Sequence, residues 1–154
     1  MDVLASWIDA YAPGARVSDE HPRLGRVHSV ALDGDCLVNV VHQSGDRPRV
    51  MMFSSPGQMV DKPGDEYAGP TDWMEVDGSC WSVAIDPCDA AVLLRWSFDA
   101  STLDELEFHA RLTRFADAHL AWADLLETAA DSAAFDDAAD STNELHRSMH
   151  ARLA

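Results

Sequence analysis

The sequence is poor in basic residues. Ten arginines and one lysine stand against 27 acidic residues, which gives a formal net charge of −16. A surplus of this sign repels nucleic acid and anionic membranes, because both are bound through basic surfaces. We therefore expect no nucleic acid and no membrane among the partners. The charge suits a basic partner protein, and it equally suits a role in solubility alone.

Cysteines and long apolar runs are scarce as well. The three cysteines are an odd number, which predicts reduced thiols in the cytoplasm rather than a disulfide framework. No run reaches the roughly 20 apolar residues that a membrane-spanning helix needs. The segment MDVLASWIDAY lacks the basic region and apolar core of a signal peptide. These features predict a cytoplasmic protein whose 154 residues form one domain.

Motifs for catalysis or for metal and cofactor binding are missing. The chain has no glycine-rich phosphate loop, and Cys36 lies among apolar strand residues, which is typical of an inert buried thiol. His146 and His150 have the spacing of two zinc ligands on a helix, but no third ligand follows nearby. His119 lies in an apolar helical stripe and is expected to be a core or interface histidine. We predict no catalytic residue, no metal and no cofactor.

The most regular pattern covers residues 90–128. A strand at residues 90–98 alternates apolar and other residues, with its apolar positions at Val92, Leu94, Trp96 and Phe98. A helix start follows, with Ser101 or Thr102 as N-cap. The helix carries one apolar stripe at Phe108, Leu112, Phe115, His119, Trp122 and Leu126. A strand that leads into such a helix predicts a sheet covered by that helix.

The other predicted elements complete an α+β domain over residues 1–128. They are a helix at 2–12 and strands at 26–32, 36–42, 49–54 and 81–85. Residues 15–25 are predicted as a connection and residues 55–79 as a long loop rich in proline and glycine. Residues 129–154 are predicted as an acidic, flexible tail. The expected fold is a twisted antiparallel sheet of about five strands, in the order α-β-β-β-loop-β-β-α, with the N-terminal helix and the long C-terminal helix packed on it.

Three segments carry a resemblance to a known family. GDCLVNVVHQSGDRPRVMMFSSPG, WSVAIDPCDAAVLLRWSFDASTLDELEF and RLTRFADAHLAWADLL resemble the second and third strands, the last two strands and the final helix of class I chaperones of bacterial type III secretion systems. The resemblance covers about residues 1–126. In the family a second helix stands where this chain has the segment 55–79. It implies a small acidic homodimer without catalysis, which holds the N-terminal segment of a secreted effector in a non-globular state and delivers it to the secretion ATPase.

Candidate binding residues follow from that resemblance and from apolar strands with two apolar faces. The strand RVMMFS places Val50 and Met52 on one face and Met51 and Phe53 on the other. If helices cover one sheet face only, an apolar face stays open to a partner; if both are covered, these residues are ordinary core. The predicted client groove consists of Leu4, Trp7, Ile8, Val50 and Met52. The predicted dimer interface consists of Trp81, Val83 and Ile85.

Two alternatives remain open at this stage. An acidic immunity or antitoxin-like protein would neutralise a basic partner through charges, and its affinity would fall steeply with salt. A small-ligand protein or enzyme would use residues 55–79 as a lid over a pocket, and a closed cavity lined by His28, His42 or Cys36 would favour it.

Overall fold

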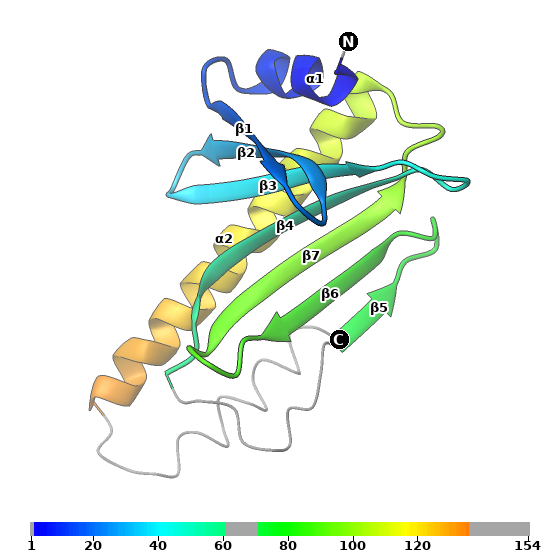
Figure 1. The fold of residues 1–154 in the computed structure, drawn as a ribbon. Helices are drawn as coiled ribbons and strands as arrows, with labels where there is room; N and C mark the ends of the chain where they lie inside the picture. Colours follow the sequence, from blue (N-terminus) through cyan, green and yellow to red (C-terminus); the bar gives the residue numbers. More distant parts are fainter. Residues whose placement is uncertain (1, 61–70, 136–154) are drawn as a thin grey trace.

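The structure is a computed structural model that describes residues 2–60 and 71–135 (Figure 1). It is an α+β domain, as the sequence predicts. The described elements are α1 (Val3–Tyr11), β1 (Arg16–His21), β2 (Gly25–Leu32), β3 (Cys36–Gln43), β4 (Arg49–Gln58), β5 (Thr71–Met74), β6 (Cys80–Ile85), β7 (Ala91–Asp99) and α2 (Glu105–Phe135).

All seven strands of the described chain form one antiparallel sheet in the order β1-β2-β3-β4-β7-β6-β5. The centre of the sheet is the pair of its longest strands, β4 and β7, which lie far apart in the sequence. α2 runs diagonally across one face, and α1 lies near the first turns of α2 (Figure 1). Both helices contribute to the same hydrophobic core, so they cover the same face of the sheet.

The sheet has more strands than the five predicted. β1 lies in the stretch 15–25 that was predicted as a connection, and β5 lies within the predicted loop 55–79. β1 is an edge strand with the sequence RVSDEH, and nearly all of its side chains are exposed. It is held by backbone pairing with β2 rather than by an apolar face, so hydrophobic periodicity cannot reveal it. β4 also continues to Gln58, past the predicted loop start.

The core confirms the predicted apolar pattern of β7 and α2. The inward-facing residues of β7 and the stripe of α2 are buried against each other: Val92, Leu94, Trp96, Phe98, Phe108, Leu112, Phe115, Trp122 and Leu126. Around Trp96 the rings are stacked. Trp81 lies 4.6 Å from Trp96 and 5.8 Å from Phe115, measured between ring centroids, and Trp73 lies 6.0 Å from Trp81.

The start and end of α2 differ from the prediction. Its N-cap is Asp104 rather than Ser101 or Thr102, because Asp104 Oδ1 accepts a hydrogen bond from the N–H of Glu107 at 2.8 Å. The helix continues to Phe135, past the domain boundary predicted at residue 128. The rest of the predicted tail, including His146 and His150, lies outside the described residues, as do residues 61–70 of the predicted loop.

The other face of the sheet is not covered by any helix of the described residues. The register places Leu37, Val41, Met51, Phe53 and Leu93 on it. Val41 and Met51 in its centre are only 0% and 9% exposed, whereas Leu37 and Leu93 are 50% and 44% exposed. A polar row, in which Ser29 Oγ donates to Asn39 Oδ1 at 2.7 Å, interrupts the apolar residues. The accessible apolar surface on this face is therefore scattered rather than continuous.

Candidate functional site

A cavity of about 640 Å³ lies between α1, the β1–β2 hairpin, the ends of β3 and β4, and the segment before α2. Its apolar wall consists of Val3, Leu4, Trp7, Val50, Ala100 and Leu103. Its polar wall consists of Asp2, Glu20, Arg26, His28, His42 and Ser44. Several of these residues are exposed, among them Glu20, Arg26 and His42, so the cavity opens to solvent at its rim. The combination of an apolar wall with a few polar groups is typical of a binding site.

α1 forms one side of the cavity because its apolar residues dock onto the core. Leu4 and Ile8, one turn apart, are buried in the core. The ring of Trp7 lies 5.7 Å from that of Phe108, measured between centroids, which brings α1 onto the start of α2. His109 Nε2 also lies 2.7 Å from the carbonyl oxygen of Trp7. These contacts fix the helix at one edge and leave its first turn beside the cavity.

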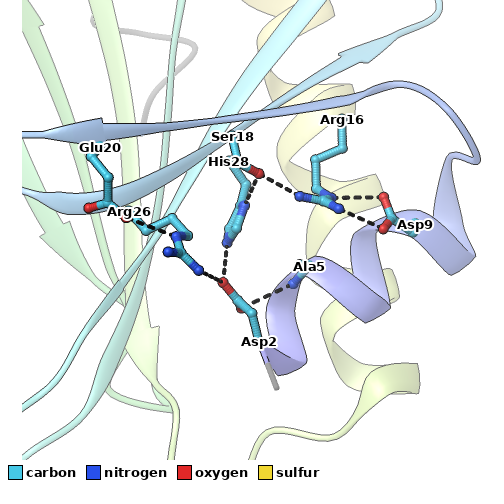
Figure 2. A network of polar contacts seen from close by, with 8 residues as sticks. All are labelled: Asp2, Ala5, Asp9, Arg16, Ser18, Glu20, Arg26 and His28. Atoms are coloured by element: carbon cyan, nitrogen blue, oxygen red, sulfur yellow. Dashed lines mark hydrogen bonds and ion pairs between the residues drawn. The ribbon is translucent and has the colours of Figure 1, made fainter.

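A chain of hydrogen bonds ties the first turn of α1 to the hairpin (Figure 2). Asp2 is the N-cap of α1, and its Oδ1 accepts a hydrogen bond from the N–H of Ala5 at 3.3 Å. Its Oδ2 lies 3.0 Å from Nε2 of His28, which is buried. On the other side of the ring, Nδ1 of His28 lies 2.8 Å from Ser18 Oγ. The buried imidazole thus bridges the helix and strand β1, and both of its nitrogens have a partner.

Two arginines extend this network. Arg16 donates from Nε and Nη2 to both carboxylate oxygens of Asp9, at 2.8 Å and 2.7 Å, and so ties the end of α1 to β1. Arg26 donates from Nε to Glu20 at 2.9 Å and approaches Asp2 at 3.7 Å (Figure 2). Burial acts to raise the pKa of Asp2. The hydrogen bond from Ala5 and the positive charges that face Asp2 outweigh burial, so its pKa lies below the ordinary value. Asp2 is therefore a carboxylate at neutral pH.

The trio Ser18, His28 and Asp2 has the residue types of a hydrolase triad but not its arrangement. In such triads the carboxylate bonds Nδ1 and the serine faces Nε2. In this protein the two nitrogens are exchanged. Asp2 and His28 contribute to the cavity wall, whereas Ser18 does not. A molecule in the cavity meets the carboxylate and not the hydroxyl, so the geometry indicates a structural tie rather than a nucleophile.

The predicted client-groove residues divide into two groups. Leu4 and Trp7 of α1 and Val50 of β4 lie together on the wall of the cavity. Ile8 and Met52 have no exposed surface and do not contribute to it. Val50 and Met52, predicted together for the client groove, both lie on the helix-covered face of β4, and of the two only Val50 borders the cavity. Both faces of β4 are apolar, so the sequence pattern does not show which of them the helices cover.

The predicted dimer residues lie on the same helix-covered face. Trp81 and Val83 are 4% and 8% exposed, and Ile85 is half-buried. β6, on which they stand, is not a sheet edge, because β5 pairs with it from Thr71↔Val83 to Met74↔Cys80. Trp81 is a core residue because its ring stacks on those of Trp96 and Phe115. Within the described residues, the surface these three side chains offer to a second subunit is small.

Two other residues behave as the sequence predicts. Cys36 is buried, and burial raises the pKa of its thiol to about 11, so it carries no thiolate at neutral pH. His119 is a core histidine. Its Nδ1 lies 2.8 Å from Ser54 Oγ, and burial lowers its pKa, which keeps the ring neutral. Cys36 does not contribute to the cavity wall.

One residue of the cavity wall could be identified from the sequence by a signal other than periodicity. Asp2 directly precedes an apolar helix, which is the usual position of an N-cap, and this predicts that its carboxylate lies at the helix start. Glu20 and Arg26 carry no comparable signal. They face each other only because the hairpin pairs Glu20 with Arg26 across its two strands.

Within residues 2–60 and 71–135, no group of three histidine, cysteine or acidic side chains is placed to hold a metal ion. Neither described helix combines the length and the hydropathy that crossing a membrane requires. Comparison of the chain with protein-family models, with curated proteins and with solved structures finds no match.

Proposed function

We propose that this chain is a secretion chaperone, which holds an extended segment of a secreted protein in a non-globular state and carries out no reaction itself. One observation supports this most. Leu4, Trp7 and Val50, three of the five residues predicted for the client groove, meet on the wall of one cavity. The cavity takes an apolar anchor side chain of the client. The resemblance to class I chaperones of type III secretion supplies the kind of client, the N-terminal segment of an effector.

The size and the wall of the cavity suit such an anchor. Pockets that bind drug-sized ligands measure about 300–1,000 Å³, and this one lies within that range, so it has room for an anchor side chain together with its neighbours in the client. Burial of one large apolar side chain contributes about 1.5–3 kcal/mol, which is too little for tight binding by itself. A homodimer, as the resemblance implies, presents two cavities to one client, and the second anchor then binds at high effective concentration. Each anchor alone binds weakly, and the client is held because two anchors bind at once. Such binding suits a client that must later be released.

The test is peptide binding with one cavity mutant and one matched control. The probe is a short peptide with a single leucine in a serine and glycine background, and a titration followed by NMR, which measures millimolar dissociation constants, gives its affinity. Val3 is 51% exposed on the cavity wall, so Val3→Trp narrows the mouth without disturbing the core. Leu106 is 79% exposed and lies outside the wall, so Leu106→Trp adds the same ring elsewhere.

We expect Val3→Trp to weaken binding at least about tenfold, which corresponds to about 1.4 kcal/mol. Leu106→Trp should bind like the unmodified chain, and a peptide with serine in place of leucine should not bind. Equal affinities for Val3→Trp and Leu106→Trp would show that the cavity does not hold the anchor.

A second candidate function is the binding of a small polar molecule. The presence of His42 on the wall favours it, because an imidazole is a versatile hydrogen-bonding group, whereas both nitrogens of the neighbouring His28 are already engaged. The predicted lid gains no support, since no residue of 55–60 or 71–79 contributes to the wall. A thermal-shift screen with small metabolites separates the two functions. Strong stabilisation by a small molecule, together with no measurable binding of the leucine peptide, would favour this second candidate.

A further inference from the structure

The polar wall of the cavity carries a net negative charge. It presents two carboxylates, Asp2 and Glu20, against a single guanidinium, that of Arg26. The N-terminus of α1 adds about half a positive charge, which does not cancel the remaining negative one. The overall charge of −16 acts in the same direction over longer distances.

The guanidinium of Arg26 does not saturate the two carboxylates. Its bond to Glu20 joins side chains that are 57% and 67% exposed, and its approach to Asp2 is 3.7 Å. Ion pairs with this exposure are weak, because water competes for both partners. A second cation can therefore share Glu20 and Asp2 with Arg26 or displace it. Asp2 remains ionised to receive it, since its pKa is lowered.

The carboxylates lie directly beside the apolar wall. Asp2 immediately precedes Val3 and Leu4, so the negative charge borders the place proposed for the anchor. Trp7 adds an aromatic surface to the same wall, and such rings attract cations as well as apolar groups. An apolar group and a cation that are neighbours in one chain can thus occupy the cavity together.

We infer that the segment held in this cavity carries a basic residue, arginine or lysine, beside its apolar anchor, and that the cation pairs with Asp2 and Glu20. This inference rests on the proposed function and specifies the chemistry of the client. It distinguishes a client segment with adjacent apolar and basic residues from a purely apolar one.

The test compares two peptides and four forms of the protein. One peptide carries arginine next to the leucine anchor, and the other carries citrulline, which has a similar shape but no charge. We expect the arginine peptide to bind the unmodified chain about two- to fivefold more tightly, as for a partly exposed ion pair. Glu20→Gln and Asp2→Asn should each reduce this preference, and asparagine keeps the N-cap acceptor of α1. Glu127→Gln removes an exposed carboxylate of α2 outside the wall and should keep the full preference.

The outcomes separate the inference from the function on which it rests. Equal binding of both peptides by the unmodified chain overturns the inference and leaves the anchor cavity intact. A preference that persists in Glu20→Gln and Asp2→Asn also overturns it, because the general field of the protein would then be the cause. Failure of both peptides to bind overturns the proposed function and this inference together. Binding that depends steeply on salt and not on the leucine overturns both in favour of an acidic neutraliser of a basic partner.

Discussion

The two ends of the helix-covered layer are built in different ways. At the end formed by β5, β6 and β7, the rings of Trp81, Trp96 and Phe115 fill the space between sheet and helix. At the end formed by β1, β2 and β3, the layer contains a cavity, and directional polar contacts such as the one between Asp2 and His28 hold α1 in addition to its buried Leu4 and Ile8. One end of the layer therefore supplies stability through dense packing. The other holds α1 in place and contains the cavity.

The largest expected effect tests the packed end. Trp96 is fully buried and touches Trp81 and Phe98, so Trp96→Ala leaves a cavity and removes ring contacts on several sides. We expect the free energy of unfolding to fall by about 3–5 kcal/mol. Urea denaturation followed by circular dichroism measures it, with Leu106→Ala as an exposed control that changes stability by less than about 0.5 kcal/mol. A loss below about 1 kcal/mol for Trp96→Ala would mean that the stack is not the stabilising end.

A smaller effect is expected at the end that contains the cavity. Asp2→Ala removes the N-cap acceptor of α1 and the partner of His28 Nε2, and we expect a loss of about 0.5–2 kcal/mol. The pKa of Asp2 is lower in the folded chain than in the unfolded one, so its ionic contribution is present above the ordinary value of 3.8. That contribution is lost as the pH falls through the folded-state pKa.

The stability difference between the unmodified chain and Asp2→Ala should therefore shrink on acidification. Urea unfolding at neutral pH and at successively lower pH measures this difference. A difference that stays constant or grows as the pH falls would contradict the assigned role of the Asp2 charge.

The same contrast explains what the sequence could predict. β7 and α2 were found because their apolar residues recur at the periods of a strand and a helix, and the packed end of the molecule is made of them. β1 is held at one sheet edge by backbone pairing, and β5 at the other edge has four residues, of which Trp73 packs on the core; neither strand has an apolar alternation that the sequence could reveal. β4 is apolar on both faces, so the sequence could not decide whether Met51 or Met52 points to the helices.

The cavity could not be predicted from the sequence either. Its wall combines the start of α1, the β1–β2 hairpin, the turn after β3 and the segment before α2, and only the tertiary structure brings these together. The apolar pattern of the sequence pointed to Leu4, Trp7 and Val50 as binding residues, but it also pointed to Ile8 and Met52, which the structure buries completely. Periodicity identifies residues that face inward. It does not tell which inward-facing residues border an empty space.

The most direct test of the account uses the tryptophans as reporters of the two ends. Trp7 lies on the cavity wall, whereas Trp81 and Trp96 lie in the ring stack. Their indole N–H signals can be followed by two-dimensional NMR during a titration with the leucine peptide, after assignment through single Trp→Phe variants. We predict that the Trp7 signal shifts while those of Trp81 and Trp96 stay in place. Shifts of the Trp81 and Trp96 signals with Trp7 unchanged would contradict it.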